Sequence, residues 1–162
     1  MRTNAQLNLH GKLRVTLKDL NGKTIKSYVR KNKIVFDGVK SVLNLLKQDG
    51  FSPLSDYQIT ELRVGTNSYP ASFTDTGLVS PVPEESGGIL PVGSGERVLS
   101  YDTSELAITK ILGPTAAIGY SLSEAALITA DGRCFARTTY TTIPKTDMFT
   151  VVYEWSIYLT VE

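Results

Sequence analysis

The chain has 162 residues, and its 17 lysine and arginine residues nearly balance its 16 aspartate and glutamate residues, so the net charge is +1. This length is typical of a single domain built around one core. A net charge near zero creates no overall field that attracts nucleic acid or an anionic membrane, and we expect neither as a partner.

Cysteine and histidine each occur once, as Cys134 and His10. A single cysteine excludes an internal disulfide and a zinc site built from several cysteines. No stretch approaches the about 18 consecutive apolar residues of a membrane helix, and the N-terminal stretch lacks the apolar core of a signal peptide. We therefore expect no metal, no cofactor, and synthesis in a cytoplasm.

The N-terminal part of the chain predicts a hairpin. Residues 7–17 alternate between apolar and polar side chains, which is typical of a half-buried strand. An Asn-Gly pair at 21–22 favours a two-residue primed turn, because it supplies the positive φ angles that such a turn needs. The chain then returns as a second strand over 24–33, for which we predict that Ile25 and Val29 point inward.

The returning strand also carries the densest basic run of the chain. We interpret these charges as a solvated strand face or as protection of a sheet edge, because lysines commonly serve both purposes. Binding of DNA is not expected from them. The run consists of Lys23, Lys26, Arg30, Lys31 and Lys33.

A change of period after the second strand predicts one short amphipathic helix over 37–48. Asp37 can cap its N-terminus, and Gly50 can end it in the left-handed conformation. The apolar stripe that covers the sheet consists of Val39, Val42, Leu43 and Leu46.

A short strand over 59–64 leads into a segment, 65–95, that is rich in glycine, proline, serine and threonine and has no period. Its length predicts an arm that is mobile in the free chain and ordered in a symmetric homo-oligomer. The segment contains an apolar cluster, Ile89, Leu90, Pro91 and Val92. An exposed apolar cluster without a binding role would favour aggregation, so these four residues are the candidate assembly contacts. The alternative, that the segment folds back on its own sheet, remains open.

The C-terminal part predicts further strands over 97–112 and 116–129, then a hairpin with a primed Asp-Gly turn at 131–132. Neither arm of that hairpin has a wholly polar face, so both of its faces are expected to be covered. The last strand, 149–161, alternates without a break. The sequence thus predicts one mainly β domain over 1–162, an antiparallel β-sandwich or jelly-roll-like fold with one short α-helix.

Catalytic residues are not apparent. His10 lies among polar strand residues, and Cys134 has no second histidine to activate it, so a triad or metal site is not indicated. The adjacent carboxylates Glu84-Glu85 would need a distant partner such as Asp102 or Glu105 to form a glycosidase site. We predict no enzyme, with cell-wall hydrolysis through Glu84 or Glu85 as an alternative to be tested.

Several short motifs occur in a fixed order along most of the chain. Together they resemble a group of small structural proteins of tailed bacteriophages, in which a strand pair, a short helix and then six motifs on strands, loops and a turn follow one another. The matching positions here are Glu61 to Thr66, Asp75 to Leu78, Glu124 to Leu127, Phe135 to Thr138, Lys145-Thr146 and Trp155. The stretch "VPEESGGILPVGSGE" departs from the pattern.

The resemblance implies a non-enzymatic virion component that decorates or bridges capsid, neck or tail subunits, with other virion proteins and further copies of itself as partners. A carbohydrate-binding tail accessory is the alternative, because aromatic rings on a sheet face can stack on sugars. Trp155 and Tyr153 share the apolar face of the last strand and are expected in the core. Tyr140 and Tyr158 are therefore the candidate glycan contacts. A β-sandwich binding module unrelated to virions would show the same alternation.

Overall fold

The computed structural model describes residues 7–47 and 53–161, which form nine β-strands, one α-helix and three short 3₁₀ helices. The prediction of a mainly β chain with one short helix is confirmed. The strands are β1 (Leu7–Asp19), β2 (Thr24–Ile34), β3 (Ile59–Gly65), β4 (Ile89–Pro91), β5 (Arg97–Ser100), β6 (Glu105–Leu112), β7 (Ser121–Thr129), β8 (Cys134–Pro144) and β9 (Phe149–Val161). The helices are α1 (Phe36–Lys47), η1 (Leu54–Tyr57), η2 (Glu84–Ser86) and η3 (Ser94–Glu96).

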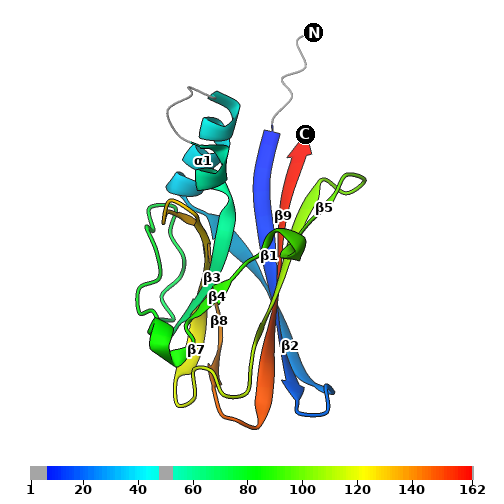
Figure 1. Cartoon of the computed structure of the whole chain (residues 1–162), viewed down its shortest axis with the longest axis vertical. Helices are drawn as coiled ribbons and strands as arrows, with labels where there is room; N and C mark the ends of the chain where they lie inside the picture. The colour runs from blue at the N-terminus through cyan, green and yellow to red at the C-terminus, as the bar shows by residue number, and fades with distance from the viewer. Residues whose placement is uncertain (1–6, 48–52, 162) are drawn as a thin grey trace.

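All nine strands of the described residues belong to one antiparallel sheet in the order β4-β3-β7-β8-β2-β1-β9-β6-β5. The sheet is curled, so that β3, β7 and β8 lie opposite β1, β9 and β5 (Figure 1). β2 joins the two halves: it pairs with β1 along most of its length, but with β8 only through Lys33 and Ile34. One curled sheet thus encloses the space in which the core forms.

The core combines side chains from both halves of the sheet. Leu13 and Trp155 come from β1 and β9, while Leu62 and Leu127 come from β3 and β7, and all four are fully buried in one cluster. Burying a large apolar side chain contributes roughly 1.5–3 kcal/mol. The predicted core positions of Trp155 and Tyr153 on the last strand are confirmed.

The prediction that Ile25 and Val29 point inward is wrong, since these side chains are 52% and 49% exposed. Residues paired across antiparallel strands share a face of the sheet. The register pairs Val29 with Arg14 on the outer face, whereas Tyr28 pairs with buried Val15 and packs against the core. The pairing register, and not the apolar character of the strand, therefore decides which of its faces is buried.

Both Gly-containing turns form hairpins, but neither is the predicted two-residue primed turn. In each turn only the glycine has a positive φ angle, +81° at Gly22 and +84° at Gly132. The amide of each glycine donates to the carbonyl three residues earlier, Asp19 O and Thr129 O. This is the pattern of a three-residue turn that ends in a left-handed glycine, which is the next most common hairpin connection.

The helix spans Phe36–Lys47, so the predicted helix is confirmed with its start one residue earlier; the predicted end at Gln48 and Gly50 lies outside the described residues. Its buried residues are Gly38 and Ser41, because Gly38 lies directly against the backbone of Phe135. Val39 and Val42 pack on the core, while Leu43 and Leu46 stay exposed. The predicted stripe is therefore only half covered. Within 7–47 and 53–161, no helix has the length and apolarity needed to cross a membrane.

Two predicted strands are shorter in the structure. Residues 97–112 form a hairpin, β5 and β6, whose turn includes Ser104 with φ +49°. Residues 116–120 precede β7 and are not extended, since Ala117 and Gly119 have positive φ angles. The long last strand is confirmed over Phe149–Val161.

The segment 65–95 folds against its own sheet instead of forming a free arm. β4 pairs with β3, and the amides of Val82 and Val92 donate to the carbonyls of Val64 and Thr60. Val92 is 5% exposed and belongs to the core, and Leu90 packs against it. The expected exposed cluster Ile89, Leu90, Pro91 and Val92 is therefore not an apolar surface patch. Pairing with β3 turns two of its apolar side chains inward.

Candidate functional site: a buried ion network beneath an exposed loop

Two charged side chains lie buried on the outer face of β7 and β8. Arg137 is 1% exposed and Glu124 is fully buried. The Nε atom of Arg137 donates to Oε2 of Glu124 at 2.9 Å, and its Nη2 atom forms an ion pair with the same oxygen at 2.8 Å. Leu127 of β7 and its cross-strand partner Ala136 of β8 face the core and alternate with the positions of Glu124 and Arg137. The ion pair therefore lies on the opposite face of the sheet, where other groups must cover it.

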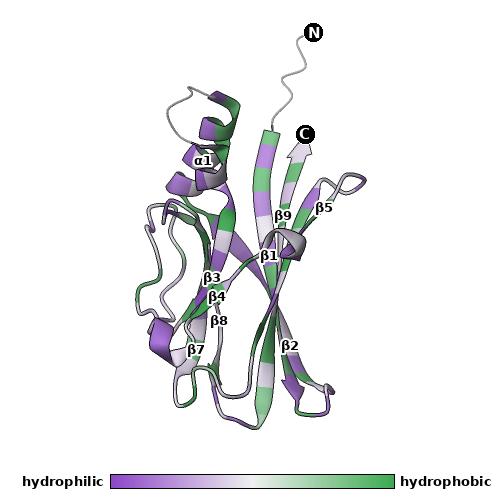
Figure 2. Ribbon diagram, in the orientation of Figure 1, coloured by the Kyte–Doolittle hydropathy of each residue, from purple (hydrophilic) through white to green (hydrophobic). Residues whose placement is uncertain are grey.

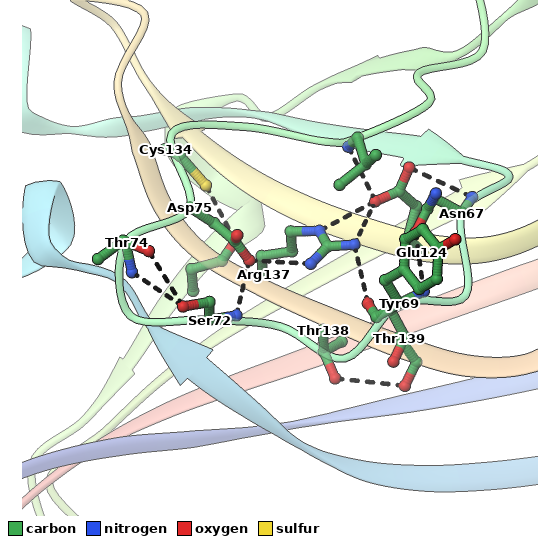
Figure 3. Close-up of polar contacts among 12 residues, drawn as sticks. Asn67, Tyr69, Ser72, Thr74, Asp75, Glu124, Cys134, Arg137, Thr138 and Thr139 are labelled. Atoms are coloured by element: carbon green, nitrogen blue, oxygen red, sulfur yellow. Dashed lines mark hydrogen bonds and ion pairs between the residues drawn. The ribbon is translucent and has the colours of Figure 1, made fainter.

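The loop of residues 66–80 provides that cover (Figure 3). Asp75 accepts from Nη1 of Arg137 at 2.8 Å, and the Tyr69 carbonyl accepts from Nη2 at 3.1 Å. Glu124 in turn accepts from the amides of Val79 and Ser80 at 3.1 and 2.8 Å. The three charges therefore hold the loop in its middle and near its C-terminal end.

The expectation that both faces of the β7–β8 hairpin are covered is confirmed, because nearly all of β7 is buried.

The arginine remains charged at this position. Burial by itself lowers the pKa of Arg137, but its hydrogen bonds to Asp75 and Glu124 and their negative charges outweigh burial and raise the pKa above its ordinary value. Buried charges need such partners, because an isolated one is strongly disfavoured. The network therefore acts as a fixed electrostatic attachment for the loop.

The start of the loop requires glycine. A Cβ atom at Gly65 would lie 2.5 Å from Oε1 of Glu124 and 2.6 Å from the Ser80 carbonyl. Both atoms belong to the attachment of the loop, so a larger residue would displace it.

The loop presents large apolar side chains to solvent. Tyr69 is 71% exposed and Phe73 is 47% exposed, and Val79 is also exposed. The ring of Phe73 packs edge-on against Phe36 of α1, with 5.5 Å between ring centroids. Between them lies a hollow of about 320 Å³ lined by Phe36, Asp37 and residues 73–76. Exposed aromatic residues on a firmly held loop are typical of protein-binding surfaces.

Asp75, Glu124 and Arg137 were not recognised as a site from the sequence. A signal was present, because each lies in one of the motifs on which the phage resemblance rests. Lys145, from a fourth motif, is also buried: its Nζ donates to the carbonyls of Pro114 and Thr146. Burial lowers the pKa of this lysine. The polar positions of the motifs thus attach loops to the sheet.

The candidate glycan contact Tyr140 is not at the surface. Its ring is 5% exposed, and its hydroxyl lies 2.9 Å from the hydroxyl of Tyr153 in the core. Tyr140 therefore cannot stack on a sugar, because its place on β8 turns it toward the core face.

Tyr158, the other candidate glycan contact, lies on the outer face of β9. It stacks on His10 with 5.4 Å between ring centroids, and its hydroxyl donates to Glu105 at 3.1 Å. Tyr158, His10, Lys12 and Asn32 help to line a groove of about 920 Å³ beside β1. Because it lies beside this groove, Tyr158 stays a candidate glycan contact.

The structure does not bring the candidate hydrolase residues together. Glu84 and Glu85 lie in η2, at the lower left of Figure 1, whereas Glu105 begins β6 at the upper right. Among the described residues, no three histidine, cysteine or acidic side chains form a group that could hold a metal ion.

The fold and the network define a curled antiparallel β domain with a loop attached by buried charges. Comparison of the chain with protein-family models, with curated proteins and with solved structures finds no match.

Cys134, close to the network, is expected to be unreactive in the folded chain. It is buried, and burial, reinforced by the charge of Asp75, raises the pKa of its thiol to about 12. At pH 8 a thiol reagent should label it only as fast as the chain unfolds, since the thiolate is the reacting form. The same chain in denaturant is the control. Rapid labelling of the native chain would contradict the prediction.

The buried tyrosine pair predicts a loss of stability at alkaline pH. Burial raises the pKa of both Tyr140 and Tyr153 above the ordinary value near 10. The unfolded chain therefore loses these protons first, so their contribution is complete below pH 10 and declines as the pH rises, by about 1.4 kcal/mol per pH unit for each hydroxyl. Urea titrations at several pH values measure this slope. The Tyr140→Phe/Tyr153→Phe double variant should flatten it, and an unchanged slope would refute the assignment.

Proposed function

We propose that the chain is a non-enzymatic structural component of a tailed-bacteriophage virion, a sandwich-like domain that bridges neighbouring capsid, neck or tail subunits. The ordered set of motifs supports this proposal. The observation that carries it furthest is the attachment of an exposed aromatic loop by Asp75, Glu124 and Arg137. A buried network of this kind specifies one conformation of a surface loop, which suits a contact repeated many times in a particle.

The sandwich-like description rests on the position of the core. Leu13 and Trp155 from one half of the curled sheet meet Leu62 and Leu127 from the other half in a single cluster. This shared cluster supports the sandwich-like description, since the sheets of a sandwich bury their inner faces against each other.

The loop 66–80 takes the assembly role that the sequence suggested for residues 89–92. Its exposed side chains Tyr69, Phe73 and Val79 are the anchors in this proposal. A loop that is already ordered loses little conformational entropy on binding, so more of the contact energy appears as affinity. The partners are other virion proteins or further copies of the chain.

Purified phage particles from the bacterium that carries the gene test the virion assignment. The chain should be present in a constant ratio to the major capsid protein through repeated density-gradient purification. Electron microscopy with an antibody should place it at one location on the particle. Its absence from purified particles would refute the proposal.

Two alanine variants test the loop itself. Tyr69→Ala and Phe73→Ala should each weaken binding to particles that lack the chain by tenfold or more, the order of magnitude expected for interface aromatic residues. Their unfolding free energies should change by less than about 1 kcal/mol, because these side chains are exposed. Tyr101→Ala, at an 84% exposed tyrosine in the β5–β6 turn, is the matched control. Equal binding by all three variants would exclude the loop as the contact.

A carbohydrate-binding tail accessory is the second candidate, favoured by the groove beside Tyr158. The Tyr158 ring is partly buried beside this groove, and aromatic rings can stack on sugars. A glycan array should then show binding that Tyr158→Ala abolishes and that Tyr69→Ala retains. An array without bound glycan would remove this candidate.

A further inference from the structure

Charge is strongly segregated between the first hairpin and the rest of the chain. Residues 7–34 contain eight lysine and arginine residues and one aspartate, a net charge of +7. Residues 35–162 contain eight lysine and arginine residues and fifteen acidic residues, a net charge of −7. The near-neutral total therefore conceals a strongly basic hairpin. Its cations are Lys12, Arg14, Lys18, Lys23, Lys26, Arg30, Lys31 and Lys33.

Among the described residues, none of these cations forms an ion pair within 4 Å. The ion pairs of the described residues involve Lys40, Arg63, Lys110, Arg133 and Arg137, all of which lie outside β1 and β2. Most of β2 is exposed on both of its faces. Figure 2 shows long hydrophilic stretches along this strand.

One edge of β2 is open. The strand pairs with β1 on one side, but on the other side its only ladder partners in β8 are Arg137 and Ala136, opposite Lys33 and Ile34. Within the described parts of the chain, residues 24–30 therefore have no strand beside them on that side, and Figure 1 shows this part of β2 running away from β8. Its backbone groups can accept a further strand.

A cationic hollow lies where the open edge meets β8. Its volume is about 460 Å³, and its charged lining consists of Arg30, Lys31 and Lys33, without an acidic residue. Thr138 and Thr139 add hydroxyl groups to the lining. Arg30 of β2 already contacts β8, since its Nη2 donates to the hydroxyl of Thr141 at 3.2 Å. Guanidinium and ammonium groups gathered in this way suit a carboxylate.

The lysine and arginine side chains of β2 favour some binding partners at its open edge over others. Lysines along an edge oppose pairing with a second copy of the same edge, because like charges would face one another. An acidic strand would meet complementary charge and also gain main-chain hydrogen bonds. A nucleic acid would use the side chains alone and leave the backbone edge open. The open edge therefore favours a protein segment.

We propose that residues 24–30 of β2 bind an extended acidic segment of a partner protein as an added strand, with one of its carboxylates in the hollow at Arg30, Lys31 and Lys33. This inference does not depend on the virion assignment, since it rests only on the positive charge of the first hairpin, the open edge of β2 and the cationic hollow beside it.

A short fluorescent peptide of alternating glutamate and threonine is the probe, used with the full chain. It should bind with an affinity that falls as salt rises. The Lys26→Glu/Lys31→Glu variant should weaken binding by tenfold or more, the order of magnitude expected for the reversal of two surface charges. Lys40→Glu, at an exposed lysine on α1, is the matched control and should retain binding. The amides of residues 24–30 should shift in NMR spectra and exchange more slowly with solvent.

A second peptide with alternate backbone N-methyl groups has the same charge but cannot form strand hydrogen bonds. Binding of both peptides with equal affinity would overturn the proposal, because the edge would then not be used. Preferential binding of a short DNA duplex that leaves the amides of residues 24–30 in fast exchange would also overturn it and identify a nucleic-acid surface. Absence of binding by the acidic peptide at low salt would overturn it as well.

Discussion

Replacing Arg137 with methionine is expected to lower the free energy of unfolding by about 3–5 kcal/mol, because Glu124 would then remain buried without its cation. The two side chains are almost completely inaccessible, and Arg137 also holds Asp75 and the Tyr69 carbonyl. Urea denaturation measures the loss as a shift of the midpoint. Methionine is the appropriate substitution, because it retains most of the side-chain volume and removes the charge.

The exposed pair Arg63–Glu61 provides the control. Its atoms approach to 2.7 Å, as closely as those of the buried pair, but both side chains are about one-third exposed. Arg63→Met should therefore cost only about 0–1 kcal/mol. Arg137→Met should also speed proteolysis within residues 66–80, whereas Arg63→Met should not. Equal costs for the two variants would show that the buried network does not hold the loop.

Replacing Gly38 with alanine is the second large expected effect, a loss of about 1–3 kcal/mol of unfolding free energy. Glycine to alanine within a helix is ordinarily stabilising by roughly 0.5–1 kcal/mol. At this position, however, the added Cβ would lie only 2.1 Å from the carbonyl oxygen of Phe135, a backbone atom that cannot rotate away. The helix would have to move off β8, which would expose the apolar residues beneath it.

Gly77→Ala is the matched control, because a Cβ at Gly77 would have no atom within 4 Å and the residue does not have a positive φ angle. This variant should change stability by only a few tenths of a kcal/mol. Urea denaturation of both variants decides the matter. A stabilised Gly38→Ala variant would show that α1 does not pack on β8 as closely as described.

Local patterns in the sequence determined the elements. The unbroken alternation of 149–161 predicted β9, and glycines 22 and 132 located two hairpins, because strand period and turn chemistry act over a few neighbouring residues. The amphipathic stretch after Asp37 predicted the helix for the same reason. The burial of Trp155 followed directly from its place on a wholly apolar strand face.

The tertiary structure alone decided which faces and segments are covered. Register turned Val29 outward, and pairing with β3 brought Val92 into the core. Glu124 and Arg137 are charged residues within β7 and β8, and their burial depends on a loop that crosses them from more than 40 residues away in the sequence. Whether a polar or apolar side chain is buried depends on what lies opposite it in space, and local periodicity carries no information about partners distant in the chain.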